Sequence, residues 1–321
     1  MKPIVLGIAS AFFFAFTFVL NRSMELSGGH WIWSASLRYF FMVPLLLLLV
    51  AGRKNLKPLF EEMKQQPGAW LLWSTIGFGL FYAPICFAAA FSPGWLIAGT
   101  WLVTIVSGSL LSPLFFETRN GERVRGRIPV KGMLMSIIIL AGVAVMQLEH
   151  AKTLGMKEFL FGVIPVLIAT FAYPLGNRKM MDVAGGRLDT FQRVLGMTIA
   201  SLPFWIGLSL YGAVTTDLPS KSQLFQSAGV AISSGVIATV LFFMATDIVR
   251  GDMTKMAAVE ATQSIEILFA LGGEVLFLAT PLPSALSWAG IALVVAGMAL
   301  HSFSASILPG KKKKSMVQEQ A

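Results

Sequence analysis

Ten long apolar stretches restrict this chain to a membrane environment. They span residues 3–20, 32–50, 69–91, 95–116, 132–148, 159–176, 190–212, 226–247, 255–279 and 284–306. Each is close to the roughly 20 residues that a helix needs to cross a bilayer core of about 30 Å. Because 55% of the 321 residues are hydrophobic and only 13% are charged, no soluble fold of this length can bury the apolar surface. The sequence therefore predicts an all-α integral membrane protein with ten transmembrane helices.

The positive charges divide unequally between the two sets of connections that join these stretches. With the N-terminus placed inside, 19 of the 25 Lys and Arg residues fall on the inner side and 4 on the outer side. Loops on the cytoplasmic side carry such an excess. The sequence therefore predicts a multi-pass protein of the plasma membrane, with both termini cytoplasmic. The net charge of +9 follows from this bias and requires no nucleic acid, and the run 311-KKKK-314 can contact anionic lipid headgroups.

The chain repeats itself at an offset of about 155 residues. The matching pieces are 6-LGIASAFFFAFTFVL-20 with 161-FGVIPVLIATFAYPL-175, 21-NRSM-24 with 177-NRKM-180, Arg38 with Arg193, and Glu117 with Glu274. Their common order predicts a first five-helix repeat over 1–150 and a second over 151–308, followed by a basic cytoplasmic tail over 309–321. Because five is odd, the second repeat begins on the opposite side of the membrane. Two inverted repeats are typical of secondary transporters, which bind solute near the midplane between the halves.

Three features carry a family resemblance. They are an Arg in the second helix of each half (Arg38, Arg193), a carboxylate closing the fourth (Glu117, Glu274), and a Gly-rich fifth helix (141-AGV-143, 296-AGM-298). This pattern resembles the drug/metabolite transporter superfamily, most of all its ten-helix branch of multidrug resistance efflux transporters. The resemblance implies export from the cytoplasm coupled to protons. The four-helix small multidrug resistance relatives carry an essential carboxylate in their first helix. Here 3–20 and 159–176 contain none, so that mechanism does not transfer.

Motifs for other chemistry are missing from the sequence. There is no G-x-x-x-x-G-K-[ST] loop for nucleotide phosphates, and no H-E-x-x-H or G-x-S-x-G. The three histidines, His30, His150 and His301, are too far apart for metal-ligand spacing. The single cysteine, Cys86, permits no intrachain disulfide. We therefore expect no enzyme activity, no cofactor and no metal.

The ninth predicted helix, residues 255–279, concentrates the ionisable groups. Such groups are costly within a bilayer and are functional candidates by default. Glu266 lies near the middle, Glu260 lies in the inner third, and Gln263 and Ser264 lie between them. We expect these four side chains to bind solute and protons, with Glu266 alternating between a proton and a cationic solute. The alternative for Glu266 is a structural acid hydrogen-bonded between helices. Other structural expectations are that Glu260 pairs with Arg193, and that Glu274 and Glu117 are helix-end residues facing water or headgroups.

Arg38, Tyr82 and Tyr173 are the remaining site candidates. Arg38 is expected to snorkel past Trp31 and Trp33, to pair with Glu25 or Glu274, or to hold a carboxylate of the solute. Arg193 is close enough to the inner surface to snorkel as well. The two phenols are better candidates than the many phenylalanines, because a phenol in a bilayer seeks a hydrogen-bond partner.

These observations favour a secondary active transporter that exports small, partly apolar solutes by alternating access, coupled to protons. Cationic, drug-like compounds are the first solute class, and amino acids or related metabolites are the second. The alternative of another class is a lipid scramblase or an intramembrane enzyme without a known motif. Expected partners are the small-molecule substrate, protons and membrane lipids. The sequence leaves open whether the protein forms a homodimer.

Overall fold

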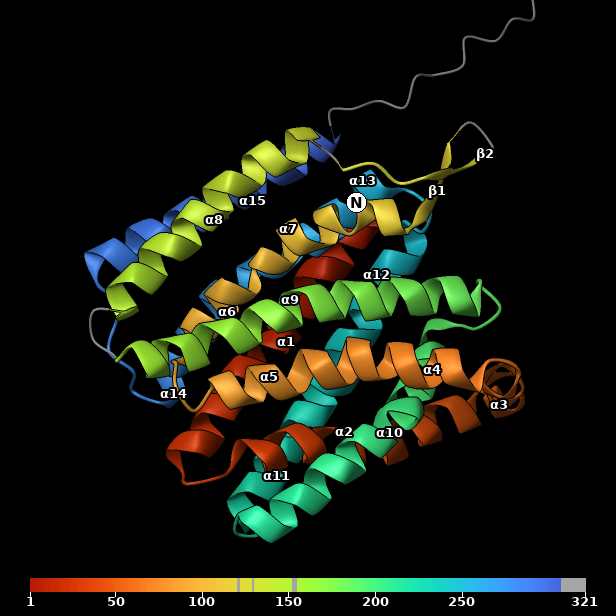
Figure 1. The fold of residues 1–321 in the computed structure, drawn as a ribbon, viewed down its shortest axis with the longest axis horizontal. Coiled ribbons are helices and arrows are strands. Elements are labelled where there is room, and N and C mark those ends of the chain that lie inside the picture. Colours follow the sequence, from red (N-terminus) through yellow and green to blue (C-terminus); the bar gives the residue numbers. More distant parts are fainter. Residues whose placement is uncertain (120–121, 129, 152–154, 307–321) are drawn as a thin grey trace, which may run out of the picture.

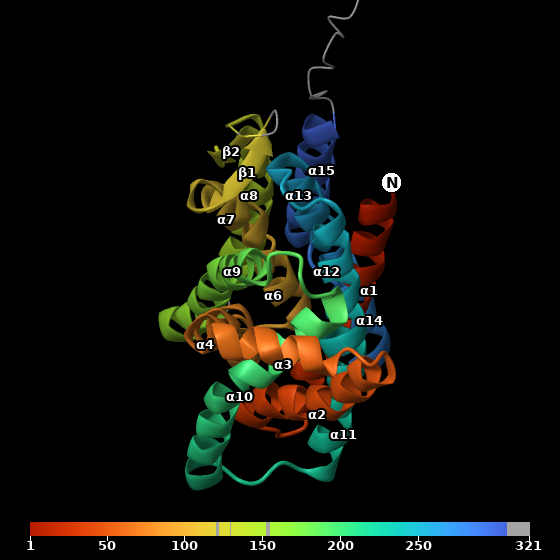
Figure 2. The ribbon, with the colours of Figure 1, turned by 90° about the vertical axis from the view of Figure 1, so that its right-hand side faces the viewer.

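The computed structural model describes residues 1–119, 122–128, 130–151 and 155–306, and over these residues the protein is a bundle of helices (Figures 1 and 2). The first half contains α1 (Lys2–Leu26), α2 (Trp31–Gly52), α3 (Leu56–Gln65), α4 (Pro67–Ser74), η1 (Thr75–Gly79), α5 (Leu80–Ala88), α6 (Gly94–Trp101), α7 (Val103–Leu110), η2 (Ser112–Leu114), β1 (Phe116–Arg119), β2 (Glu122–Arg125) and α8 (Val130–Ala151). The predicted basic tail, 309–321, lies outside the described residues.

The second half continues with a similar order of helices. It contains α9 (Met156–Ala184), α10 (Thr190–Thr215), α11 (Lys221–Val230), η3 (Ala231–Ala238), α12 (Thr239–Ile248), α13 (Met253–Ala261), η4 (Thr262–Ile265), α14 (Glu266–Phe277) and α15 (Ala285–Ser306). Each of the ten predicted stretches coincides with one or more of these helical segments, in the same order along the chain. The antiparallel β1–β2 hairpin, which the sequence did not predict, lies in the connection between the fourth and fifth stretches.

Within the described part of the chain, six helices are long and apolar enough to cross a membrane. They are Lys2–Leu26, Trp31–Gly52, Pro67–Ala88, Met156–Ala184, Thr190–Thr215 and Lys221–Ile248. Shorter apolar helices cover Gly94–Leu110, Ser136–Ala151 and Ala285–Leu300. The expectation of a helical, multi-pass membrane protein is therefore confirmed, whereas the number of ten crossings stays a prediction.

Helix α9 is longer than predicted, and its length matters for the site. The stretch 159–176 was expected to end before Arg178, but the helix continues to Ala184. It ends at Gly185, whose positive φ of 58° closes the last turn in the left-handed conformation that glycine adopts without strain. Arg178 therefore lies inside a membrane-crossing helix rather than in an inner connection.

The predicted third, fourth, eighth and ninth helices are interrupted. The third and eighth contain the π-helical segments η1 and η3, both of which include glycine. The fourth breaks at Leu102, between α6 and α7, and the ninth contains the 3₁₀ turn η4 before α14. Such breaks are tolerated in a membrane where neighbouring helices or a cavity satisfy the freed backbone groups.

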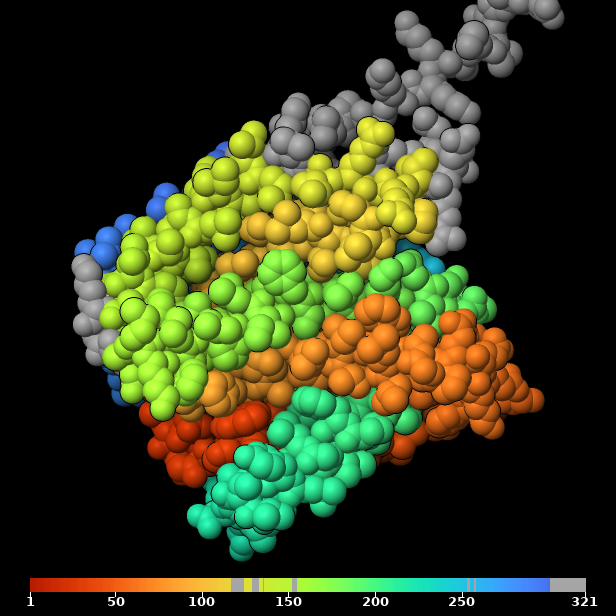
Figure 3. All heavy atoms as spheres, in the orientation of Figure 1, coloured from red at the N-terminus to blue at the C-terminus, as the bar shows by residue number. Residues whose placement is uncertain are grey.

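Packing pairs corresponding helices of the two halves. Helix α2 packs on α10, and α8 packs on α15. Helix α1 packs on η3 and α12, while α9 packs on η1 and α5. The first helix of each half therefore packs on the third helix of the other half. Helices α1 and α9 run in opposite directions across the bundle in Figure 1, and Figure 3 shows α8, α9 and α4–α5 as contiguous bands on one face. Two inverted repeats would produce this reciprocal pairing, and the repeat itself stays a prediction.

Candidate functional site

Two adjoining cavities lie in the centre of the bundle and share part of their walls. Trp101, Tyr173 and Gln263 line both. The first cavity extends towards Arg178 and Arg193, and the second extends towards Thr17, Phe81 and Glu266. Their volumes are only about 20 and about 10 Å³. Because one water needs roughly 10–15 Å³ measured in this way, the side chains nearly fill the site and it is closed to a larger solute.

The shared wall coincides with the helix breaks. Trp101 is the last residue of α6 before the break at Leu102, and Gln263 lies in η4. Tyr173 precedes Pro174, which interrupts the hydrogen bonding of α9. The cavities therefore lie where three helices depart from regular α geometry, an arrangement that transporters use to build solute sites.

Among the described residues, Glu266 is a buried carboxyl without a hydrogen-bond or ion-pair partner. It is the first residue of α14, is 1% exposed, and lines the second cavity beside Phe14, Phe18, Phe81 and Ile85. Its Oε1 accepts no hydrogen bond. Because desolvation penalises a carboxylate, this apolar wall favours the protonated form, and an approaching cation favours the ionised form. The expectation of a structural hydrogen bond between helices has no support at Oε1.

Several other polar atoms in these walls also lack partners. The hydroxyl of Tyr173, both side-chain polar atoms of Asn177, and Nε of Arg193 are buried and unbonded. Unsatisfied buried groups are rare in native proteins, and a cluster of them points to a ligand or water site. Together with Glu266 they make the two cavities the candidate site.

An ion pair closes one side of the first cavity. Arg178 on α9 donates to Glu260 on α13, with Nη2 lying 2.7 Å from Oε1 and 2.6 Å from Oε2. Its Nη1 donates to the carbonyl of Gly108 on α7 at 2.6 Å. The expectation that Glu260 pairs with Arg193 is therefore wrong, because the longer α9 brings Arg178 closer.

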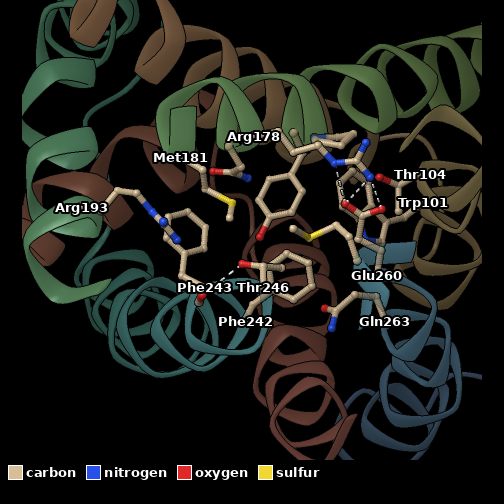
Figure 4. Close-up of a pocket in the computed structure, with 14 residues that line it drawn as sticks. Trp101, Thr104, Arg178, Met181, Arg193, Phe242, Phe243, Thr246, Glu260 and Gln263 are labelled. Atoms are coloured by element: carbon tan, nitrogen blue, oxygen red, sulfur yellow. Dashed lines mark hydrogen bonds and ion pairs between the residues drawn. The ribbon is translucent and has the colours of Figure 1, made fainter. Parts of the chain in front are cut away.

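Arg193 lies on the opposite side of the same cavity from Arg178 (Figure 4). Its Nη1 lies 2.5 Å from Oδ1 of Asp247, and Thr190 donates to Oδ2 of Asp247 at 2.9 Å. The guanidinium also lies 4.5 Å from the ring centroid of Phe243. Arg193 is therefore buried and paired, and the expectation that it snorkels to the inner surface is wrong.

Arg38 forms a second cluster with Tyr82. It is 1% exposed, its Cζ lies 4.0 Å from the Tyr82 ring centroid, and its Nε and Nη1 have no hydrogen-bond partner. Neither of the expected structural roles, snorkelling or pairing with Glu25 or Glu274, is present. Tyr82 lines neither cavity, and its hydroxyl donates to Oδ1 of Asn21 at 3.2 Å.

Two residues of the ninth predicted helix face away from the cavities. The Ser264 hydroxyl donates to the carbonyl of Ala261 at 2.6 Å and contacts the sulfur of Met298 on α15. Glu274 is fully buried and accepts from the amides of Gly94 at 2.7 Å and Trp95 at 3.4 Å. It thus caps the N-terminus of α6, where a negative charge is favourable, and the expectation that it faces water is wrong. The Glu117 side chain lies outside the described residues.

The structure therefore brings Glu266, Gln263, Tyr173 and Glu260 together, places Arg38 and Tyr82 in a neighbouring cluster, and turns Ser264 away. Sequence reasoning missed Asn177, Arg178 and Asp247. The signal for the first two was the match of 177-NRKM-180 to 21-NRSM-24, with no helix breaker between Asn177 and Gly185. Among the described residues, no group of three or more His, Cys, Asp or Glu side chains could hold a metal ion.

Comparisons with known proteins cover almost the whole chain. The family model described as "Putative multidrug resistance efflux transporter" (EmrE) matches residues 1–307. The uncharacterized protein YjlA of Bacillus subtilis (strain 168) is 57% identical over 317 residues, which are 98% of each chain. An uncharacterized 42.1 kDa protein of Shouchella clausii is 49% identical over 83% of this chain and 70% of its own. A solved crystal structure with 15% identity covers 95% of this chain and 97% of its own at a TM-score of 0.67, which supports the fold alone.

Proposed function

This chain belongs to the EmrE family of multidrug resistance efflux transporters, and we propose that it is a secondary transporter that exports small, partly apolar solutes in exchange for protons. One observation carries the proposal. The carboxyl of Glu266 is buried, has an unbonded oxygen, and lines a cavity of only about 10 Å³ between the helices. A transporter that uses no nucleotide needs such a group to link solute and proton movement.

The coupling follows from competition at one carboxyl. In the apolar wall around Glu266 the protonated form is favoured, so a proton entering from outside binds there. A cationic solute arriving from the cytoplasm favours the carboxylate and so releases the proton. Because the carboxyl holds either a proton or a solute cation, each export event returns a proton to the cytoplasm.

The cavity walls suit an apolar or aromatic solute. The Tyr173 ring lies 4.5 Å from Phe81, 5.5 Å from Trp101 and 5.8 Å from Phe242, measured between centroids. Aromatic faces attract organic cations as well as apolar groups. The same rings leave almost no free volume, so a solute must enter when the bundle opens.

Alternating access is supported by the reciprocal packing of the two halves, in which the first helix of each half packs on the third helix of the other. If the halves are inverted repeats, each can adopt the conformation of the other, which opens the cavity first to one side and then to the other. Opening towards the inner side requires that the contacts of Arg178 with Glu260 and Gly108 separate. We propose that the protein lies in the plasma membrane, with both termini and the connection that contains α3 on the cytoplasmic side.

Purified protein in sealed vesicles tests this function. Benzyltrimethylammonium, a permanent cation with one aromatic ring, is added outside vesicles that contain a pH-sensitive dye. The expected result is proton movement that requires both the protein and the cation, and that disappears in Glu266→Gln. The matched control is Glu274→Gln on the same helix, which should retain the flux because Glu274 faces neither cavity. Lipid exchange without proton flux would support a scramblase and overturn the proposal.

A further inference from the structure

We infer that Arg38, Asn21 and Tyr82 form a binding subsite for a carboxylate of the transported solute. The inference rests on the proposed function and narrows its substrate class. A solute that places a cation at Glu266 and a carboxylate at Arg38 is zwitterionic, as an amino acid is.

The first argument is the state of the Arg38 guanidinium. It is almost completely buried, two of its nitrogens have no hydrogen bond, and among the described residues no carboxylate lies within ion-pair distance. Burying a charge without a counter-charge is unfavourable. The contacts with the Tyr82 ring at 4.0 Å and the Tyr39 ring at 5.5 Å offset only part of this cost. An anionic ligand would offset the remainder.

The corresponding arginine of the second half shows how this chain stabilises a structural guanidinium. Arg193 also lies over an aromatic ring, that of Phe243. In addition it has Asp247 at 2.5 Å, and Asp247 is itself held by Thr190. Arg38 has the ring without the acid. The difference between two otherwise similar positions indicates that the acid for Arg38 comes from outside the protein.

The second argument is the set of donors around Arg38. The Tyr82 hydroxyl donates to Oδ1 of Asn21, and this leaves Nδ2 of Asn21 buried and unbonded. Nε and Nη1 of Arg38 on α2 and Nδ2 of Asn21 on α1 are therefore three donor nitrogens without an acceptor next to the Tyr82 side chain. A ligand that only accepts hydrogen bonds satisfies such donors, and a carboxylate is a ligand of this kind with two oxygens to offer a guanidinium.

Aromatic side chains connect this subsite with Glu266. Phe81 lines the cavity of Glu266, and its ring centroid lies 6.1 Å from that of Tyr82 and 4.5 Å from that of Tyr173. A solute ring packed on Phe81 would lie in the cavity of Glu266 and adjoin the Tyr82 ring over which Arg38 lies. We therefore assign the ammonium group to Glu266 and the carboxylate to Arg38.

Three probes with the same ring separate the two charges. They are 3-phenylpropionate, which is an anion, benzyltrimethylammonium, which is a cation, and L-phenylalanine, which carries both charges. The thermal stability of the purified full-length protein is measured with each probe, because a ligand that binds the folded state raises Tm. In the wild type we expect phenylalanine and phenylpropionate to raise Tm in a saturable way.

Arg38→Gln should weaken binding of both carboxylates by about tenfold or more, as loss of a charged hydrogen-bond partner does, while binding of benzyltrimethylammonium stays unchanged. Arg38→Lys keeps the charge but loses the fork geometry, and should also weaken carboxylate binding. If Arg38→Gln does not fold, carboxylate binding by Arg38→Lys tests the subsite instead. The matched control is Arg22→Gln, next to Asn21, because Arg22 already donates to the carbonyl of Ala89 at 2.9 Å. It should leave carboxylate binding unchanged.

Two results overturn the inference. One is the absence of any Tm shift with either carboxylate in the wild type. The other is a carboxylate-induced Tm shift in both Arg38 variants that equals the shift in the wild type. If cation-driven proton flux persists in either case, the proposed function stands and only the carboxylate subsite is wrong. If carboxylates bind through Arg38 but no cation drives proton flux, the subsite stands and the proposed coupling is wrong.

Discussion

The guanidinium of Arg178 binds both carboxylate oxygens of Glu260, and the same side chain donates to the carbonyl of Gly108. One buried residue thus joins α9, α13 and α7 beside the central cavity. Because α7 belongs to the first half of the chain and the other two helices belong to the second, this contact holds the halves together.

Removal of both partners of this pair should cost less stability than the sum of the two single removals. Arg178→Gln leaves the Glu260 carboxylate buried and unpaired, and Glu260→Gln does the same to the guanidinium, at a cost of about 3–5 kcal/mol each. The double variant should be more stable than the sum of the single losses predicts. Thermal unfolding of the four proteins in detergent measures this coupling. Additive losses would show that the two side chains act independently.

Glu266→Gln should fold, insert and bind solute, yet lose the link between solute and protons. In the wild type, affinity for benzyltrimethylammonium should fall as the pH drops, because the proton and the cation compete for one carboxyl. Binding titrations at several pH values measure this dependence, which should largely disappear in the variant. Glu274→Gln is the control, because it removes the cap of α6 and should lower Tm while the pH dependence remains. An unchanged pH dependence in Glu266→Gln would make Glu266 structural and Glu260 the next candidate.

Tyr173→Phe and Tyr82→Phe should differ in their effects. The Tyr173 hydroxyl has no partner, so its removal should change solute preference with little effect on Tm. The Tyr82 hydroxyl is bonded to Asn21, so its removal should cost about 1 kcal/mol of stability as well. Competition among the three phenyl probes, together with Tm, measures both effects. Parallel losses of protein amount and binding in Tyr173→Phe would indicate a packing role.

An ion pair outside the membrane-crossing helices should make stability depend on pH. Arg187 lies 2.5 Å from Glu62, and its hydrogen bonds hold the pKa of Glu62 below the ordinary value of 4.5. Because the folded-state pKa is depressed, the pair stabilises the fold above about pH 4.5, and this contribution is lost as the pH falls through the folded value.

Glu62→Gln should therefore lower Tm at pH 7 and flatten the fall of Tm between pH 5 and pH 3, about the range over which a depressed carboxyl titrates. The control is Glu61→Gln on the same helix, because Glu61 is exposed and lies 3.8 Å from the exposed Lys57. Surface pairs of this kind contribute little. Equal profiles for the two variants would contradict a specific contribution from Arg187.

The charge bias predicts the orientation in the membrane. A reporter that is active only in the cytoplasm should be active when it is fused after Ala321, and silent when it is inserted in the 149–157 connection. The reverse pattern would exchange the inner and outer assignments for every connection. A signal at both positions would contradict a single orientation.

The sequence by itself determined the class of protein, because the length and apolarity of the ten stretches permit only membrane helices. It also located the acid-rich ninth helix, the two arginines at matching positions, and the repeat that pairs 177-NRKM-180 with 21-NRSM-24. These are local or periodic features, and they can be recognised along the sequence without knowing which residues are in contact in the fold.

Only the tertiary structure decided which of these groups are paired. Arg38 and Arg193 occupy matching positions, yet Asp247 on another helix reaches only Arg193. Glu260, Glu266 and Glu274 follow one another along the ninth predicted helix, yet the first is paired with Arg178, the second is unbonded, and the third caps α6. The reason is that rotation about the helix axis, the turn η4 and the length of α9 set which neighbour each side chain meets. A buried charge is stabilised by that neighbour, not by its position in the sequence.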